Sequence, residues 1–448
     1  MERKLTSGSV AKSMLVFALP YLLSYFLQTL YGMADLFITG QFYGVDHITA
    51  VSNGSQIMHM ITVIIVGLAM GTTVIVGRYV GGNRMEDAEE TIGNTVTMFL
   101  VLSILTTGVL LLLRQPIVYL LGTPQEAIAG SIAYLTITFL GIPFITVYNI
   151  ISSIYRGLGD SKTPMYFIGI ACAFNIVLDY VFIGYLHLGA SGAALGTTIS
   201  QTFSVVLAIL CIRKKKSGIS LRKSHFVPKR QVLGRILKIG VPVAVQDGCI
   251  QIAFIIITII ANHRGLHDAA AVGIVEKIIT AIFIVPSSML ATISTLSAQN
   301  IGANKHDRVA KILRLGTMIT AGYGVLATVI VLCWGNQIIG LFTADASVIL
   351  LGTQYISSYI FDSILAGIHF CFTGYFCAYG KSYIGFIHNI LAIALVRLPV
   401  SYLFSAWYPD TLFPMGLAAP AGSLLSVMIC VIVYFGMKKR GSLGTIKA

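Results

Sequence analysis

Long apolar runs separated by short polar segments make up most of this chain of 448 residues. A helix needs about 20 consecutive apolar residues to cross the roughly 30 Å hydrocarbon layer of a bilayer. Twelve runs of that kind lie near residues 14–39, 48–76, 91–113, 131–153, 164–186, 190–212, 235–262, 270–297, 311–334, 349–376, 383–405 and 413–437. The pattern therefore predicts twelve transmembrane helices and no β-sheet.

Composition supports the same interpretation. Hydrophobic residues make up 56% of the chain and charged residues only 10%, a balance that is typical of a membrane protein. The chain also contains 44 glycines, many of them inside the apolar runs. Small residues let helices pack closely in lipid, so we expect a compact, all-α membrane protein.

The net charge of +13 has an uneven distribution along the chain. Of the 30 Lys and Arg residues, 26 fall in segments on one side of the predicted membrane, and only Arg114 and Arg264 fall in loops on the other side. The positive-inside rule then places both termini in the cytoplasm of a multi-pass protein of the plasma (inner) membrane. We expect the basic loop 213–238 to contact the anionic inner leaflet, and we expect no nucleic-acid partner.

Short segments of the first half recur in the second half at a nearly constant spacing. The matching pairs are V-G-G-N-R-M-E-D-A (80–88) with I-G-A-N-K-H-D-R-V (301–309), Y-R-G-L-G-D-S (155–161) with F-C-A-Y-G-K-S (376–382), and A-L-P (18–20) with G-V-P (240–242). Each match is weak alone, but all three keep the same order and spacing. They predict two homologous halves.

The repeat predicts the domain organisation. We expect an N-terminal six-helix lobe at 1–212, a basic cytoplasmic linker loop at 213–238 and a C-terminal six-helix lobe at 239–448. Six is an even number, so both lobes enter the membrane in the same orientation, as parallel repeats do in transporters. The predicted fold is two pseudo-symmetric lobes around a central cavity.

Acidic residues inside the spans are few: Asp35, Asp179, Asp247, Glu276 and Asp362. A charged side chain in mid-membrane costs about 2.5–3.5 kcal/mol on insertion scales, so each of these residues needs a compensating role. Asp179 follows another polar residue, Asn175, by four positions, which places both side chains on one helical face.

Carboxylate, amide and hydroxyl oxygens together suit a hard cation or a proton. We therefore expect Asn175 and Asp179 to form a cation or proton site with Asp35 and a hydroxyl from Thr197 or Thr198. The alternative is that the pair only holds helices together. Near the repeat spacing, Asp35, Asn175 and Asp179 correspond to Ile257, Val396 and Val400. Because the second half lacks these polar residues, the fold does not require them, and a functional role is favoured.

Neither ATP hydrolysis nor catalysis has a recognisable motif here. The chain contains no G-x-x-x-x-G-K-[ST] loop, no G-x-S-x-G and no H-E-x-x-H. His369 and His388 stand alone in their spans, which predicts hydrogen-bonded core residues. We expect a protein that is not an enzyme and is driven by an ion gradient.

The chain resembles the multidrug and toxic compound extrusion (MATE) family of secondary transporters over nearly its whole length. The resemblance rests on Pro20 before Asp35, G-R-Y-V-G-G-N-R after the second span, Y-R-G-L-G-D-S-K-T-P, N-x-x-x-D in the fifth span, G-A-A-L-G-T in the sixth and A-Q-N-I-G-A-N-K in the second half. It implies a twelve-helix antiporter that expels organic cations, drugs or amphipathic metabolites in exchange for H⁺ or Na⁺ by alternating access. A lipid-linked saccharide or lipid flippase of related fold is the alternative.

The resemblance also implies roles for particular residues. Asp35, Asn175, Asp179 and Thr197 match the family's N-lobe cation site, and Pro20 matches a proline at which the first helix bends. No cofactor and no metal other than Na⁺ at Asp35, Asn175 and Asp179 is implied. We expect the protein to act as a monomer on a small-molecule substrate within the lipid bilayer.

The second half departs from the NorM-like branch of the family and is closer to the DinF-like branch. The NorM-like branch has a glutamate in its seventh span, where this chain has Gln246 and Asp247. A second cation site is therefore not implied. We expect a polar network or substrate contacts from the buried polar residues of this half: Gln246, Asp247, Glu276, Asp362 and Arg397.

Overall fold

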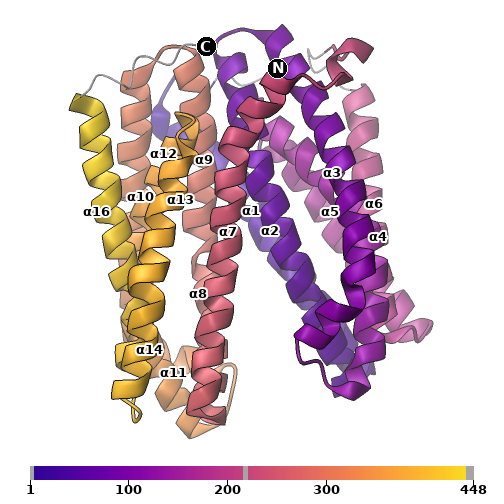
Figure 1. Ribbon diagram of the computed structural model, residues 1–448, viewed down its shortest axis with the longest axis vertical. Helices are drawn as coiled ribbons and strands as arrows, with labels where there is room; N and C mark the ends of the chain where they lie inside the picture. The colour runs from indigo at the N-terminus through magenta and orange to yellow at the C-terminus, as the bar shows by residue number, and fades with distance from the viewer. Residues whose placement is uncertain (1–4, 215–219, 440–448) are drawn as a thin grey trace. The chain divides into compact units, whose positions relative to one another are not determined.

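The computed structural model describes residues 5–214 and 220–439, and these residues are mostly helical (Figure 1). The helices of the first half are α1 (Val10–Phe42), α2 (Val45–Gly81), α3 (Met85–Leu120), α4 (Gln125–Gly157), α5 (Lys162–Asp179), the π-helix η1 (Tyr180–Tyr185), α6 (Gly189–Lys214) and the 3₁₀-helix η2 (Lys223–Phe226). The basic loop expected at the inner leaflet includes residues 215–219, which lie outside the described residues.

The second half continues the same pattern. Its helices are α7 (Arg230–Arg264), α8 (Leu266–Ile282), α9 (Ile284–Gly302), α10 (His306–Gly340), α11 (Ala346–Tyr359), α12 (Asp362–Ala378), α13 (Ser382–Ala392), the π-helix η3 (Ile393–Arg397), α14 (Leu398–Trp407), α15 (Phe413–Gly416) and α16 (Ala418–Lys439). Across the described residues there is no β-strand.

The predicted number of membrane spans agrees with the structure. Within the two described ranges, eleven helical segments are long and apolar enough to cross a membrane, and α11 with α12 forms a twelfth candidate that bends by 42° at its break. The helices extend several residues beyond the apolar runs, because their polar ends can continue into the membrane–water interface. The all-α prediction is confirmed.

Several spans are interrupted, and proline explains two of the interruptions. The π-helix η3 precedes Pro399, which lacks the N–H that a regular helix would need there. The break between α8 and α9 at Phe283 similarly precedes Pro286. The break after Tyr359 has no nearby proline.

The two halves share their turns as well as their helices. Asn83 after α2 and Asn304 after α9 both adopt left-handed backbone angles, with φ of 58° and 56°. Gly159 and Gly380, which also correspond in the repeat, have φ of 93° and 68°. Each turn closes with the same pattern of three backbone hydrogen bonds, so the weak sequence repeat corresponds to a real structural repeat.

Contacts divide the chain into two compact units. Leu19–Gly240 belongs to the first unit, and Leu5–Ala18 groups with the chain from Val241 onward in the second. Each division lies inside a long helix, α1 or α7, and close to a proline, Pro20 or Pro242. The early turns of α1 therefore pack with the second half of the sequence.

The first unit is built around α2, which packs against α3, α4 and α6. Close approach depends on glycine: a Cβ on Gly71 of α2 would lie 2.2 Å from the backbone oxygen of Ile236. The outer faces remain apolar, as shown by Leu112 on α3 with 81% of its surface exposed. Such exposed apolar faces are suited to lipid contact.

Candidate functional site

Asp35 and Asp179, the two mid-span acids of the first unit, lie together in its interior. Asp35 is on α1, and Asp179 is the last residue of α5, where η1 begins. Their exposed fractions are only 2% and 0%. The two carboxyl groups are within hydrogen-bonding reach of each other. The structure thus brings acids from two separate helices to one buried point.

Two neutral polar side chains hold these carboxyl groups. Thr197 on α6 donates its hydroxyl to Asp35 Oδ2 at 2.8 Å. Asn175 donates its side-chain amide to Asp179 Oδ1 at 3.3 Å, one helical turn away on α5. Asn175 is itself fully buried. The four residues that the sequence singles out in this half are therefore in contact with one another.

Three oxygen atoms of this cluster have no hydrogen-bond donor. They are Asp35 Oδ1, Asp179 Oδ2 and Asn175 Oδ1, all buried. Buried polar atoms without partners are unusual because leaving them unpaired costs about 1–3 kcal/mol each. A proton shared between the carboxyl groups would satisfy two of them. A Na⁺ ion would have carboxylate, amide and hydroxyl oxygens as ligands, which is the donor set that hard cations prefer.

Glycine leaves the space that this cluster occupies. A Cβ on Gly196, which precedes Thr197 on α6, would lie 2.1 Å from Asp179 Oδ1 and 3.5 Å from Asn175 Nδ2. Contacts under 3.0 Å are essentially never found, so a larger residue would displace the carboxyl group. The G-T sequence thus supplies both the space for one acid and the donor for the other.

Tyr31 and Ser200 extend the cluster, and the sequence analysis did not include them. The Tyr31 hydroxyl donates to the Thr197 carbonyl oxygen at 2.9 Å and also hydrogen-bonds the Ser200 hydroxyl. The sequence spacing could have indicated Tyr31, since it lies one turn before Asp35 on α1 and therefore on the same helical face. Thr198, considered as an alternative to Thr197, instead contacts Gly141 on α4, and its hydroxyl has no partner.

Pro20 lies inside α1, fifteen residues before Asp35. Its ring nitrogen cannot donate a hydrogen bond, so the helix lacks one backbone bond at this turn. Ser24 also donates its hydroxyl to the Pro20 carbonyl oxygen at 2.9 Å, a contact that favours helix bending. The hydrogen-bond ladder of α1 is therefore weakened at this turn.

In the second unit, Glu276, Asp362 and Arg397 form a separate electrostatic network, in which Asp362 is buried and the other two are half-buried. Arg397 interacts electrostatically with both acids and donates a hydrogen bond to the Tyr359 hydroxyl. Its guanidinium group also lies 4.9 Å from the centre of the Phe254 ring, a cation–π distance. One oxygen of each acid and the Arg397 Nε atom have no hydrogen-bond partner. The acids of this unit thus have a permanent positive charge beside them.

A cavity of about 60 Å³ adjoins this network and is lined by Asp362, Arg397 and His369 among others. His369 and His388 stand alone in sequence but are paired in the structure, where their ring centres lie 5.5 Å apart. Each ring accepts or donates one hydrogen bond, to Ser423 at 3.4 Å and to Thr373 at 3.1 Å. No local sign of this pairing exists in the sequence, since the two residues come from different helices.

Gln246 and Asp247 do not join this network through any contact of the described residues. The Gln246 side chain is buried on α7, and its Oε1 atom would lie 3.1 Å from a Cβ on Gly385 of α13. Asp247 lies near the Cys377 thiol. The structure therefore groups three of the five polar residues predicted in this half and places the other two elsewhere.

Comparison with known proteins gives one family for both halves of the chain. The MatE family model matches residues 20–181 and again residues 242–403, which together are more than half of the sequence. The two matches begin at Pro20 and Pro242, in agreement with the internal repeat. A probable multidrug resistance protein of Bacillus subtilis (strain 168), YoeA, is 26% identical over 98% of this chain and 97% of its own.

Other relatives and solved structures indicate the same kind of protein. The multidrug export protein MepA of Staphylococcus aureus (strain N315) is 25% identical over 95% of this chain and 94% of its own. A solved structure described as an outward-facing multidrug resistance MATE family transporter superposes with a TM-score of 0.89 at 20% identity, covering 98% of both chains. A transporter from Pyrococcus furiosus Vc1 superposes with a TM-score of 0.90 at 19% identity, covering 99% of this chain and 98% of its own. These likenesses confirm the predicted twelve-helix, two-lobe fold.

Proposed function

Since the chain belongs to the MatE family of membrane transporters, we propose that it is a secondary antiporter. It exports organic cations, drugs or amphipathic metabolites in exchange for H⁺ or Na⁺. The family membership makes the protein a transporter and not an enzyme. What we propose beyond this family membership is the coupling ion, the cargo and the direction of transport.

The observation that carries the proposal is the pair of buried carboxyl groups of Asp35 and Asp179. They lie within hydrogen-bonding reach, and each has one oxygen without a donor. Their hydrogen-bond donors are neutral, an amide from Asn175 and a hydroxyl from Thr197. Two like charges this close in a buried site strongly disfavour the fully ionised form. A proton or Na⁺ therefore binds there as the compensating charge.

An ion gradient supplies enough free energy for such transport. One unit charge that moves through about 100 mV releases about 2.3 kcal/mol. At about 1.4 kcal/mol per factor of ten, this corresponds to an accumulation ratio of roughly fiftyfold for a neutral cargo exchanged against one cation. Proton or sodium movement is thus sufficient without ATP.

Coupling requires that the ion and the cargo favour different conformations of the protein. In our proposal, the ion-loaded site favours one shape of α1 and the cargo-loaded protein favours another. Asp35 is part of α1, so charge compensation at the site acts directly on this helix. The missing backbone hydrogen bond at Pro20 lowers the cost of changing the helix shape.

The choice of cationic or amphipathic cargo rests on charge. The spans contain five acids but only two basic residues, Lys277 and Arg397, which favours positively charged cargo. The names of the relatives, multidrug resistance and multidrug export proteins, point to cargo of broad chemistry. The DinF-like assignment, based on Gln246 where the NorM-like branch has glutamate, stays a prediction.

The proposal is tested with purified protein in vesicles loaded with a cationic dye such as ethidium. Dye movement is measured under an imposed pH gradient and then under an imposed Na⁺ gradient. We expect one of the two gradients to drive dye movement, and we expect Asp35→Asn and Asp179→Asn each to reduce driven movement to that of protein-free vesicles. These changes keep the side-chain size but remove the charge that binds the ion.

Glu126→Gln is a matched control, because Glu126 is exposed at the start of α4. It should transport as the unchanged protein does. Near-normal gradient-driven transport by both site variants would refute the proposed ion site. Dye movement that responds to neither gradient would refute the antiport mechanism itself.

The orientation in the membrane and the monomeric state belong to the same proposal. We infer that both termini face the cytoplasm of the cell membrane, because 26 of the 30 basic residues lie on that side of the predicted topology. The orientation is tested in a variant that lacks the seven native cysteines and carries one cysteine at the exposed Lys439. It is labelled with a membrane-impermeant reagent in intact cells. Reaction before cell lysis would contradict the inferred orientation.

A further inference from the structure

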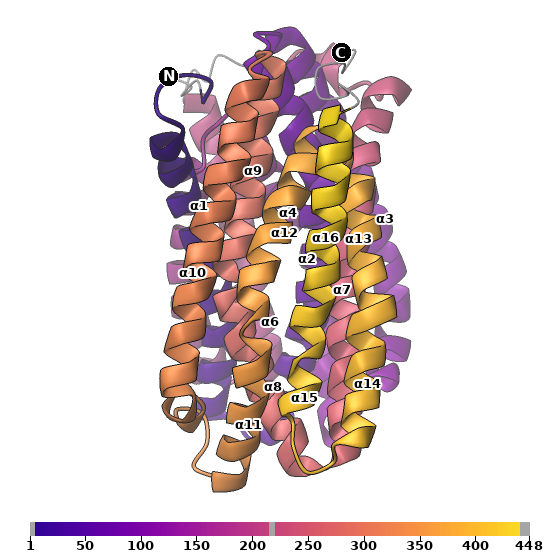
Figure 2. The ribbon, with the colours of Figure 1, turned by 90° about the vertical axis from the view of Figure 1, so that its left-hand side faces the viewer.

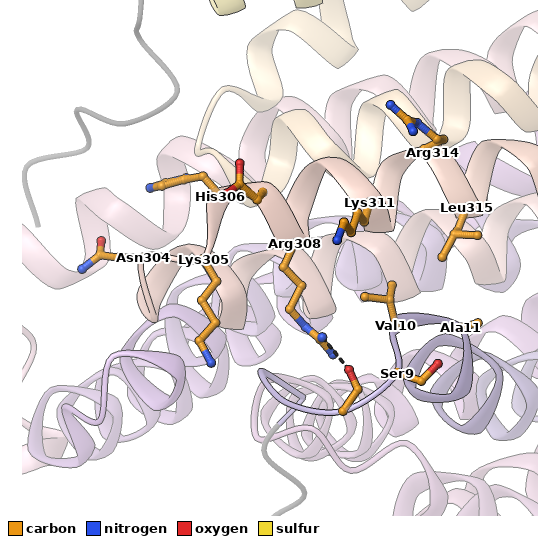
Figure 3. A pocket seen from close by; sticks show the side chains of 12 residues that line it. Ser9, Val10, Ala11, Asn304, Lys305, His306, Arg308, Lys311, Arg314 and Leu315 are labelled. Carbon is orange, nitrogen blue, oxygen red and sulfur yellow. Dashed lines mark hydrogen bonds between the residues drawn. The ribbon is translucent and has the colours of Figure 1, made fainter.

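An open pocket of about 950 Å³ lies in the second unit, where the first turn of α1 meets the start of α10. These two helix ends lie side by side in Figure 2, and Figure 3 shows the pocket from close by. One wall is formed by Gly8 and Ser9 and by the first two residues of α1, Val10 and Ala11. The opposite wall carries four basic side chains: Lys305, Arg308, Lys311 and Arg314. The pocket therefore concentrates positive charge at a helix end.

Two of these basic residues hold the chain that leads into α1. Arg308 donates a hydrogen bond to the Gly8 carbonyl oxygen at 2.6 Å, which is the dashed line in Figure 3, and a second to the Ser7 carbonyl oxygen at 2.9 Å. Lys305 donates to the Thr6 carbonyl oxygen at 2.9 Å. All three acceptors are neutral, so these contacts fix the side chains in place without cancelling their charge.

The other two basic residues, Lys311 and Arg314, are exposed on α10. Among the described residues, none of the four basic side chains forms an ion pair within 4.0 Å, and neither does Asp307, the carboxylate of the pocket. With four basic groups against one acid, the pocket keeps a net positive charge. Such a charge attracts an anion.

The first unit contains the equivalent pocket, of about 470 Å³, at the start of α3. At the spacing of the internal repeat, three positions of the two pockets correspond: Arg84 to Lys305, Asp87 to Arg308 and Glu90 to Lys311. The turn before each pocket has the same backbone conformation. Two acidic positions of the first pocket are therefore basic in the second.

Acids pair with two of the four basic residues of the first pocket. Arg84 Nε lies 2.8 Å from Asp87 Oδ2, and Lys229 forms an ion pair with Glu90. The hydrogen bond from Arg84 to Asp87 raises the pKa of Arg84 above its usual value. The first pocket also contains Arg230 and Arg235, so its four basic residues, two of them paired, face two acids, whereas the four of the second pocket face one acid and form no ion pair among the described residues. The larger charge excess of the second pocket is therefore not a requirement of the fold.

The pocket continues into an apolar surface. Val10 on α1 and Leu315 on α10 are part of its lining. About one turn further along each helix, Leu15 and Met318 have 60% and 64% of their surfaces exposed. Both helices are predicted membrane spans, so this surface leads from the interface toward the hydrocarbon layer. Basic groups next to an exposed apolar strip match a phospholipid, which is anionic at one end and apolar at the other.

We propose that this pocket binds the headgroup of an anionic phospholipid, whose phosphate contacts Lys311 and Arg314 while its acyl chains lie along Leu15 and Met318. A soluble phosphate would satisfy only the basic part of the site. The apolar strip is the reason to choose the lipid. Because the pocket includes the start of α1, the bound lipid also stabilises the contact between α1 and α10.

The test measures binding of fluorescent phosphatidylglycerol to the purified full-length protein in detergent, with fluorescent phosphatidylcholine as the neutral reference. We expect tighter binding of phosphatidylglycerol. Each basic residue near a phosphate contributes about 1 kcal/mol, so Lys311→Gln with Arg314→Gln should weaken that binding about thirtyfold. Lys311→Glu, which introduces the acid found at the equivalent Glu90, should weaken it at least as much.

The matched control is Lys438→Gln with Lys439→Gln, which removes two exposed charges from the end of α16. This control should change phosphatidylglycerol binding less than about twofold on the same scale. Equal weakening by both double variants would overturn the proposal, because binding would then depend on overall charge. Equal binding of the two lipids would also overturn it. Displacement of the lipid by millimolar inorganic phosphate would overturn the choice of a lipid and indicate a soluble-anion site.

Discussion

The two units of this transporter treat their buried acids differently. In the first unit, Asp35 and Asp179 have only neutral donors as hydrogen-bond partners. In the second unit, Glu276 and Asp362 share the positive charge of Arg397. Since both units descend from one repeat, the difference was not imposed by the fold. Acids without a fixed countercharge can exchange a mobile ion, whereas acids near an arginine already have part of their charge compensated.

The largest loss of stability should come from removing Arg397, the fixed charge of the second unit. Arg397→Gln leaves Glu276 and Asp362 without their nearby cation and removes the hydrogen bond to the Tyr359 hydroxyl and the contact with the Phe254 ring. A hydrogen bond from a charged donor contributes about 1.5–3 kcal/mol by itself. We expect a clear fall in thermal stability in detergent. The fall should shrink at low pH, because protonation of the acids removes the uncompensated charge.

Arg397→Lys is the matched control, since it keeps the charge while losing the planar contact with the Tyr359 and Phe254 rings. It should be more stable than Arg397→Gln. Unchanged stability of Arg397→Gln together with a loss of gradient-driven transport would contradict the comparison. The second unit would then also contain a functional ion site.

Gly196→Ala should produce the next largest loss of stability and transport, although it removes no polar atom. The added methyl group would lie 2.1 Å from Asp179 Oδ1, and overpacking of this kind costs about 1–3 kcal/mol. We expect lower thermal stability and weaker ion-driven transport. Gly322→Ala on α10 is the control, because nothing lies within 4 Å of the added atom. Equal behaviour of the two variants would argue against a tightly packed ion site.

The smallest effect should come from single hydroxyl groups. Thr197→Val removes the hydrogen bond to Asp35 Oδ2, and bonds to charged groups contribute about 1.5–3 kcal/mol. We expect the apparent affinity for the coupling ion to change by at least about tenfold. Thr198→Val should change it little, since the Thr198 hydroxyl has no partner. A larger effect of Thr198→Val would indicate a different geometry of the site during transport.

The sequence was sufficient to predict the spans and the repeat, because both depend on local pattern. Apolar length alone identifies a membrane helix, and the repeat is visible in three short matches that keep one spacing. Asn175 and Asp179 could be assigned to one helical face from their spacing. Asp35 and a hydroxyl of Thr197 or Thr198 were candidates because they are polar residues in the spans. The family resemblance favoured Thr197, because no local pattern specifies which spans are neighbours. The role of these residues in ion binding stays a prediction.

Other features could not be predicted for the same physical reason. The His369–His388 pair joins α12 and α13, and the Tyr31–Ser200 contact joins α1 and α6. A membrane helix is apolar on most of its circumference, so its hydrophobic period does not reveal which face meets which partner. The break of the tenth span after Tyr359 also lacks a local signal, since no proline is near it.

The grouping of Leu5–Ala18 with the second unit, and of the chain up to Gly240 with the first, has a practical consequence for dissecting the molecule. A gene split in the basic loop would yield two polypeptides, each lacking a short piece that packs in its own compact unit. The amino-terminal product would lack the first turns of α7, and the carboxy-terminal product would lack the start of α1. Neither product is a self-sufficient module, so co-expression of both is required to rebuild two complete packing units.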